Sequence, residues 1–261
     1  MNAPTRFREL NEVLRVFVAA VRDVLGENLC GVYLQGSLAV GDADEHSDVD
    51  FIVVTYGPLG PDDPAALQAV QKRVYAMPTT WAQHLEGSYI TRDLLMTVDP
   101  GDTPLLYFDN GSTDIAWDDH CNTAVVRWSL REHGISLFGP DARELIDPVT
   151  PDHLRAEMAE TLRKWDDLLA DRSFDWSRRF QGLLVLSICR ILHTLGCGRV
   201  TSKRQAGEWA LGALDLEWHD LIQGALEDRP DPWVKVREQA DPRLLVRSYA
   251  FLDYALSRSR N

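Results

Sequence analysis

The stretch GVYLQGSLAVGDADEHSDVDFIVV, residues 31–54, decides the fold of the first half of this chain. It reads as a strand, a turn with Gly36 and Ser37, and, ten residues later, a second strand that starts with Asp48 and Asp50. Side chains in a strand alternate between its faces, so these two carboxylates project from the same side. Two adjacent carboxylates repel each other, but a divalent cation such as Mg²⁺ can bind both. The stretch therefore predicts a metal site.

The turn before these carboxylates has the chemistry of a phosphate site. Gly36 has no side chain, so the backbone there can approach a ligand closely. Ser37 offers a hydroxyl and a backbone N–H to a phosphate oxygen. Turn and carboxylates together predict a site for a metal and a nucleotide. A calcium loop is excluded, because the glycine at its sixth position and its closing Glu are both missing.

The spacing of these residues resembles the signature of a known superfamily. Gly36-Ser37, ten residues, and then Asp48-Val49-Asp50 are similar to the motif of the polymerase-β-type nucleotidyltransferases. The resemblance implies a catalytic α/β domain, a mixed sheet with flanking helices, that uses Mg²⁺ and ATP.

A third carboxylate is expected from a neighbouring strand. Glu86 lies in QHLEGSYI, residues 83–90, which has the alternation of a strand, and Asp93 is the second candidate. In polymerase-like members a third acid completes the metal site. In the aminoglycoside-modifying branch, a Glu here resembles the general base that takes the proton of the substrate hydroxyl. Glu86 is thus predicted as base or as third metal ligand, with both roles open.

Periodicity and breakers predict the other elements of the first half. These are a helix over residues 6–25, strands over 29–34 and 49–55, a helix from Asp63-Pro64, an irregular segment over 100–117, and a helix over 118–133. Asp118, Asp119 and His120 could be metal ligands, but acidic residues at a helix start also complement the helix dipole, which suffices to explain them.

The second half has helical periodicity throughout. Prolines at 148 and 151 flank a short link, and we place the domain boundary there, with residues 1–148 as the catalytic domain and 149–261 as an all-α helical bundle. Helices are expected around 154–169, 180–195, from 201–202 onward, and at 216–226, 233–237 and 244–256.

One part of the bundle carries a second resemblance. LSICRI at 186–191, GRVTSK at 198–203 and GEWA at 207–210 are similar to the carboxy-terminal domain of the spectinomycin/streptomycin adenylyltransferases. The resemblance implies that Arg190 and Lys203 bind the nucleotide phosphates, and that Ser47 joins Gly36 and Ser37 in the nucleotide site. The acceptor is then a small, hydroxylated, cationic molecule in the interdomain cleft.

The sequence differs from this subgroup at positions where those enzymes bind their antibiotics. A tryptophan expected near residues 108–111 is absent. Acidic residues expected just before the Arg190 helix are replaced by Arg178, Arg179, Phe180 and Gln181, and Asp175 is the only acid nearby. Two arginines disfavour the guanidinium-rich streptomycin and leave spectinomycin, another aminocyclitol or an unrelated acceptor open.

Charge and composition limit the kinds of partner that we expect for this chain. Residues 1–150 hold 23 Asp and Glu against 10 Lys and Arg, which accounts for the whole net charge of −13. An acidic amino-terminal half disfavours binding of nucleic acid and favours binding of a cationic substrate. The longest apolar run, around residues 183–189, is too short to span a membrane. The four cysteines form no CxxC pair, so we expect reduced thiols in a cytoplasmic protein, and we expect a monomer.

These observations predict an enzyme that transfers AMP from ATP to a hydroxyl of an aminocyclitol- or aminoglycoside-like molecule and releases pyrophosphate. Two alternatives stay open: a nucleotidyltransferase that modifies a protein partner, as in toxin–antitoxin pairs, and a catalytically silent binding protein.

Overall fold

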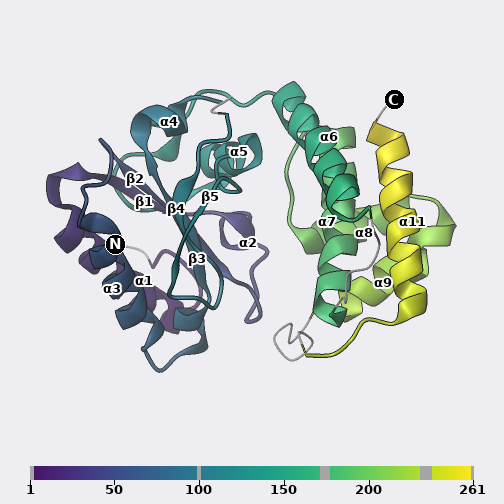
Figure 1. Ribbon diagram of the computed structural model, residues 1–261, viewed down its shortest axis with the longest axis horizontal. Helices are drawn as coiled ribbons and strands as arrows, with labels where there is room; N and C mark the ends of the chain where they lie inside the picture. The colour runs from purple at the N-terminus through teal and green to yellow at the C-terminus, as the bar shows by residue number, and fades with distance from the viewer. Residues whose placement is uncertain (1–2, 99–100, 171–176, 230–236, 260–261) are drawn as a thin grey trace. The chain divides into compact units, whose positions relative to one another are not determined.

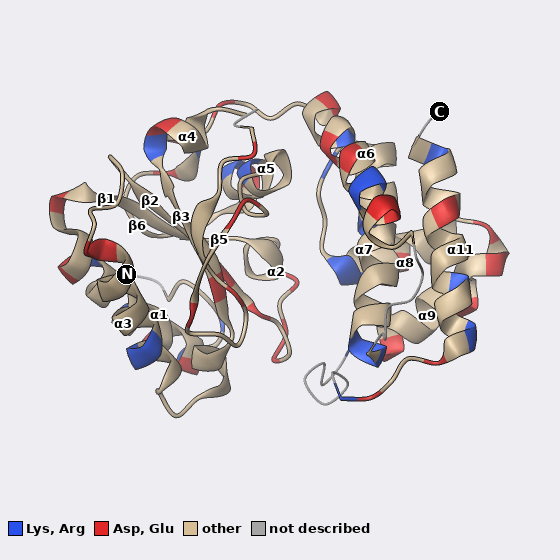
Figure 2. Cartoon of the chain, viewed as in Figure 1, with Lys and Arg blue, Asp and Glu red and all other residues tan. Residues whose placement is uncertain are grey.

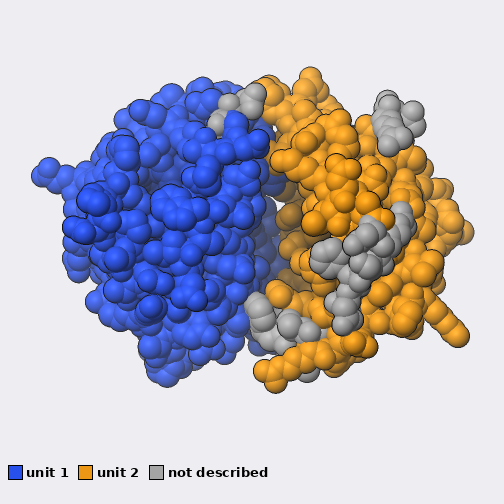
Figure 3. All heavy atoms as spheres, in the orientation of Figure 1, with its two compact units in different colours: residues 1–149 blue, residues 150–261 orange. Residues whose placement is uncertain are grey.

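The computed structural model describes residues 3–98, 101–170, 177–229 and 237–259. The chain divides into two units, residues 1–149 and 150–261, which Figure 3 colours separately. Figure 1 gives the labels of their helices and strands.

A six-stranded mixed sheet forms the centre of the first unit, with the order β5-β4-β3-β2-β1-β6. β2 and β3 pair in parallel, and all other neighbours pair antiparallel. The strands are β1 (Leu29–Leu34), β2 (Val49–Thr55), β3 (Leu85–Thr91), β4 (Leu105–Phe108), β5 (Ile115–Asp118) and β6 (Ile135–Phe138). The predicted strands over 29–34 and 49–55 are confirmed, as is the mixed sheet with flanking helices.

Helices cover both faces of this sheet because β1 and β2 are apolar on both sides. Phe51 faces α1 (Arg8–Leu25) and α3 (Asp63–Tyr75), and its ring centroid lies 4.7 Å from that of Phe17. Its neighbour Ile52 faces the other way and joins a second core with α4 (Arg92–Met96) and α5 (Ala124–His133). The short helix α2 (Gly36–Ala39) and the turns η1 (Gly26–Asn28), η2 (Thr80–Gln83) and η3 (Ala142–Glu144) complete the unit.

The segment between Glu86 and the domain boundary differs from its prediction. Residues 100–117, predicted irregular, contain β4 and most of β5, and the helix predicted from 118 begins only at Ala124. Edge strand β6 was not predicted. Each of these three strands has four residues, too few for a periodic signal, and each is stabilised by pairing with a strand distant in sequence.

The second unit is helical, as predicted. Its elements are α6 (Pro151–Leu168), α7 (Arg178–Cys197), α8 (Lys203–Ala213), η4 (Leu216–Trp218), α9 (His219–Glu227) and α11 (Pro242–Ser259). α7 contacts α6, α8, α9 and α11, so it is the central helix of the bundle. The helix predicted at 233–237 falls largely on residues outside the described ranges.

Helix α7 is longer than the apolar run from which the sequence argued against a membrane span. By length and composition alone, its 20 residues would suffice to cross a bilayer. The argument from a short run is therefore wrong for this helix. However, 56% of its apolar 18-residue window is buried inside the structure, which agrees with the central position of α7 among its neighbouring helices.

Candidate active site

The register between β2 and β3 places two carboxylates side by side. Asp50 is the direct partner of Glu86 in this parallel pair, and both side chains lie on the face that α4 and α5 cover. Asp48 comes just before β2, two residues from Asp50. Carboxylate oxygens of Asp48, Asp50 and Glu86 all lie within 4.8 Å of one another.

Such a cluster is electrostatically costly without a cation. Two unit charges at 4.8 Å repel by about 3 kcal/mol at an effective dielectric constant of about 20, and three such pairs occur here. The three groups are half-buried, so water screens them only in part. Because Mg²⁺ takes carboxylate oxygens as ligands, this donor set fits that ion. The structure therefore supplies a group of residues that could hold a metal.

The turn after β1 lies in close contact with this cluster. Gly36 has a φ of 62°, and a Cβ atom added there would lie 1.9 Å from Oδ2 of Asp50. The backbone N–H of Gln35 donates to the Asp50 carbonyl at 3.0 Å, which fixes the turn to β2. Ser37 Oγ is buried and has no hydrogen-bond partner among the described residues. A close backbone approach and an unsatisfied hydroxyl fit a phosphate group beside the carboxylates.

Substitution of Gly36 by Ala is expected to lower kcat/KM for ATP by at least about 10-fold, because the new Cβ must displace Asp50. Gly41→Ala is the matched control: Gly41 also has a positive φ, 73°, but nothing lies within 4 Å of its added Cβ. Both variants carry the strain of a non-glycine residue at positive φ, about 1–2 kcal/mol. Steady-state kinetics with varied Mg-ATP measures the difference, and equal losses in the two variants would contradict a special role of Gly36.

Hydrogen bonds within the loop before Asp48 stabilise its conformation. Ser47, predicted to bind the nucleotide, is buried, and its hydroxyl donates to Oδ1 of Asp44 at 3.2 Å and accepts from the Asp44 N–H at 3.0 Å. The His46 N–H donates to the same carboxylate at 3.0 Å. The contacts of Ser47 with Asp44 thus shape the loop that leads into Asp48.

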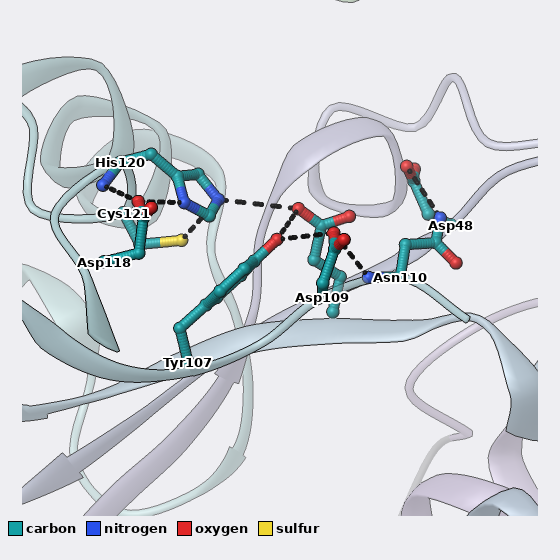
Figure 4. Close-up of polar contacts among 8 residues, drawn as sticks. Asp48, Tyr107, Asp109, Asn110, Asp118, His120 and Cys121 are labelled. Carbon is teal, nitrogen blue, oxygen red and sulfur yellow. Dashed lines mark hydrogen bonds and ion pairs between the residues drawn. The ribbon is translucent and has the colours of Figure 1, made fainter. Parts of the chain in front are cut away.

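Strand β4 contributes a residue that the sequence did not single out for the site. The hydroxyl of Tyr107 lies 2.8 Å from Oε1 of Glu86 and 3.0 Å from Oδ1 of Asp109. Figure 4 labels Tyr107 and Asp109 and marks the contact between them with a dashed line. Burial raises the pKa of Tyr107 strongly, and the Glu86 and Asp109 carboxylates raise it further. Tyr107 therefore stays protonated and acts as a hydrogen-bond donor between two acids. Tyr107 lies within the apolar run Leu105–Phe108, which gives no local sign of this role.

His120 joins the site from the loop after β5. Its Nε2 lies 3.5 Å from Oε1 of Glu86 and 3.4 Å from Sγ of Cys121, and its Nδ1 lies 2.8 Å from Oδ1 of Asp118. Burial alone would lower the pKa of His120, but its bonds to Cys121, Glu86 and Asp118 outweigh burial and raise it to about 11. The hydrogen bond from the His120 backbone N–H has the largest effect on Asp118 and lowers its pKa, and the hydrogen bond from the His120 ring lowers this pKa further.

The helix-dipole explanation of Asp118, Asp119 and His120 is therefore wrong. Asp118 ends β5, and α5 begins at Ala124 with Thr123 as its N-cap. These residues lie in a strand end and a loop that carries His120 to Glu86.

A buried arginine anchors this loop. Arg127 is fully buried, and its guanidinium donates to the carbonyls of Leu94, Leu95 and Thr123 and to Oδ1 of Asn122, at 2.7–3.1 Å. Asn122 in turn donates to the carbonyl of Thr103 at 3.1 Å, on the segment before β4. The loop with His120 is thus tied to α4, α5 and the start of β4.

A second chain of contacts reaches Asp48. Nδ2 of Asn110 lies 3.5 Å from Oδ2 of Asp48, and Oδ1 of Asn110 lies 3.0 Å from Nδ1 of His84. The end of β4 and the loop after it therefore contact two of the three clustered acids, Glu86 through Tyr107 and Asp48 through Asn110 (Figure 4).

Arg190 and Lys203 belong to the second unit. Arg190 lies in α7, and Lys203 is the first residue of α8, after its N-cap Ser202. Figure 2 colours the charged residues, and residues 151–261 hold 17 acidic and 17 basic side chains. Arg178, one of the two arginines that replace expected acids, donates to Asp228 at 2.7 Å and to Glu238 at 2.9 Å, so carboxylates of the bundle balance its charge.

Comparison with known proteins gives two family models in succession. A model of the nucleotidyltransferase domain matches residues 19–79, which include β1, the Gly36 turn and β2. A model of the aminoglycoside adenylyltransferase C-terminal domain matches residues 144–249, which include Arg190 and Lys203. The chain belongs to the aminoglycoside nucleotidyltransferase family. It is accordingly a nucleotidyltransferase.

Individual members of this family match along most of the chain. An "Aminoglycoside (3'') (9) adenylyltransferase" of Shigella flexneri is 25% identical over 238 residues, covering 82% of this chain and 83% of that protein. A "Spectinomycin 9-adenylyltransferase" of Staphylococcus aureus is 27% identical over 219 residues, covering 77% and 78%. The crystal structure of spectinomycin adenyltransferase AAD(9) from Enterococcus faecialis with ATP and spectinomycin has the same fold, with a TM-score of 0.71 and 17% identity over 96% of this chain and 99% of that one.

Proposed function

We propose that this family member transfers AMP from ATP to a hydroxyl of an aminocyclitol or aminoglycoside and releases pyrophosphate. The observation that carries the proposal is the cluster of Asp48, Asp50 and Glu86, within 4.8 Å, beside the turn with Gly36 and Ser37. The names of the matched relatives support an aminoglycoside or spectinomycin as the acceptor.

In this proposal Asp48 and Asp50, with or without Glu86, bind Mg²⁺, and Gly36, Ser37 and Ser47 bind the triphosphate. Mg²⁺, when bound, neutralises negative charge on the phosphates. Arg190 and Lys203 add positive charge for the same group, since the first unit is strongly acidic. Glu86 takes the proton of the acceptor hydroxyl, because an alcohol near neutral pH is a poor nucleophile until its proton is removed.

The acidic field of residues 1–150 favours a cationic acceptor. Spectinomycin and related aminocyclitols meet this requirement, whereas a guanidinium-rich streptomycin is disfavoured because the acids expected before the Arg190 helix are absent. We propose that the protein acts as a monomer in the cytoplasm.

The test is pyrophosphate release from Mg-ATP with a panel of aminocyclitols and aminoglycosides, with the Asp50→Asn variant as the blank. Release with spectinomycin or a related compound, absent in the blank, supports both the reaction and the acceptor class. Release that occurs only with an added protein, or with no member of the panel while Mg-ATP still binds, would overturn the acceptor.

Lys203→Ala is expected to raise KM for ATP about 10–100-fold with a smaller change in KM for the acceptor, because a hydrogen bond to a charged group contributes about 1.5–3 kcal/mol. Arg204→Ala is the matched control, since Arg204 is the next residue in α8 and pairs with Glu208 at 3.1 Å on the surface. Steady-state kinetics with each substrate varied in turn measures both constants. An effect confined to the acceptor would contradict the role of Lys203.

A further inference from the structure

Two side chains, those of Tyr107 and His120, contact Glu86 through the same oxygen. The hydroxyl of Tyr107 lies 2.8 Å from Oε1, and Nε2 of His120 lies 3.5 Å from the same atom (Figure 4). Among the described residues, no hydrogen bond or ion pair to Oε2 of Glu86 is found. The two oxygens of this carboxylate therefore have different environments.

We propose that Tyr107 and His120 are positioning residues, which hold Oε1 of Glu86 so that Oε2 takes the proton of the acceptor hydroxyl. This inference rests on the proposed function. A glutamate side chain has three rotatable bonds, and two contacts to one oxygen restrict the orientation of its carboxylate. Restricting a base to one geometry contributes to catalysis because a small misplacement can cost about 10²-fold in rate.

The two positioning residues are themselves held firmly. Tyr107 is buried on β4, paired with Ser88 of β3, and its ring packs edge-on against His120 with centroids 4.3 Å apart. His120 is fixed by Asp118, which accepts hydrogen bonds at 2.8 Å from both its backbone N–H and Nδ1. The contacts to Glu86 thus come from a buried tyrosine and from an exposed histidine whose backbone and ring are both bound by Asp118.

The Tyr107 hydroxyl has one proton and two acceptors, Glu86 and Asp109. In the proposed step, the acceptor oxygen forms a bond to the α-phosphorus, the bond from that phosphorus to the pyrophosphate oxygen breaks, and the acceptor proton moves to Oε2 of Glu86. The neutral Glu86 is then a weaker hydrogen-bond acceptor, and Asp109 can accept the hydrogen bond from the Tyr107 hydroxyl in its place, while the proton stays on Tyr107. Asp109 gives the donor a second partner during the step.

The first test compares Tyr107→Phe in two backgrounds. In the wild-type enzyme the variant is expected to lower kcat by about 10- to 100-fold and to change KM for ATP by less than about 3-fold. In the Glu86→Gln enzyme, the same change is expected to alter the remaining kcat less than about 2-fold, because residues that act as a unit are not additive. Equal losses in both backgrounds would overturn the proposal, as would a loss confined to KM.

Tyr33→Phe is the matched control. Tyr33 is also fully buried in the core on this face of the sheet, and its hydroxyl donates to the Pro140 carbonyl at 2.9 Å. Within the described ranges it makes no hydrogen bond to the clustered acids. It loses a comparable hydrogen bond, so its kcat is expected to stay within about 2-fold of wild type. His120→Gln, which retains a polar side chain, is expected to lower kcat less than Tyr107→Phe and to show the same dependence on Glu86.

A second test does not depend on activity. Thermal unfolding of Tyr107→Phe, Glu86→Ala and the double variant measures whether the two side chains interact, because alanine, unlike glutamine, cannot accept the Tyr107 hydrogen bond. Tyr107→Phe is expected to lower Tm by about 2–4 °C in the wild-type background and by clearly less in the background that lacks the Glu86 carboxylate. Additive shifts would show that the contact is absent and overturn the inference. If the wild-type enzyme modifies no compound in the panel, the proposed acceptor fails, and the unfolding result alone decides for or against the orientation of Glu86.

Discussion

Asp50→Asn is expected to lower AMP transfer by at least about 10³-fold while the protein stays folded. The substitution keeps the size of the side chain but removes one of the three clustered charges. It also replaces a carboxylate oxygen beside Gly36 by an amide group, a poorer ligand for Mg²⁺. Pyrophosphate release measures the loss, and binding of Mn²⁺, followed by its paramagnetic signal, measures the metal affinity separately.

Asp93→Asn is the control for this variant. Asp93 was the second candidate for the third carboxylate, but it is exposed on α4 and is not part of the cluster within 4.8 Å. Its substitution is expected to leave transfer within about 2-fold of wild type. An active Asp50→Asn enzyme with unchanged metal affinity would refute the metal site, and an inactive Asp93→Asn enzyme would reassign the third acid.

Glu86→Gln is expected to slow the chemical step by about 10²–10⁴-fold, the usual contribution of a positioned general base. Glutamine keeps the shape of the side chain and can still accept the hydrogen bond from Tyr107, but it cannot take a proton. The same variant also separates the two roles that the sequence left open. If Glu86 acts only as a base, the variant should have a lower kcat and an unchanged Mg²⁺ requirement. If Glu86 is a metal ligand, a higher Mg²⁺ concentration should restore part of the rate.

Single-turnover kinetics over a range of Mg²⁺ concentrations distinguishes these outcomes. Glu27→Gln, at an exposed position in η1, is the control for a neutralised surface acid. A single-turnover rate for Glu86→Gln equal to that of wild type would remove Glu86 from both roles.

Much of the first unit could be predicted from local sequence. The apolar strands β1 and β2 and the turn between them have strong signals, because both strands are buried on both faces and the glycine at 36 interrupts them. The helices of the second unit have clear periodicity and N-cap residues, such as Thr150 and Ser202. The alternating pattern of residues 83–90 also predicted Glu86 as the third acid of the site.

The residues around Glu86 could not be predicted in the same way. Tyr107 and Asn110 lie in a segment predicted to be irregular, and His120 in one predicted to be helical. Their roles depend on contacts across 21, 62 and 34 positions of sequence, to Glu86 and Asp48. No local property distinguishes such a tyrosine or histidine from one that packs in a core.

The local sequence thus established the strand–turn–strand with its two aspartates, the third acid, and the change from an α/β half to a helical half. These follow from side-chain periodicity and backbone preference, which act over a few residues. The tertiary structure decided that Asp50 and Glu86 are direct partners and that Tyr107 and His120 meet on one oxygen of Glu86. The physical reason is that strand register and loop anchoring are set by packing between distant segments, which no short stretch of sequence contains.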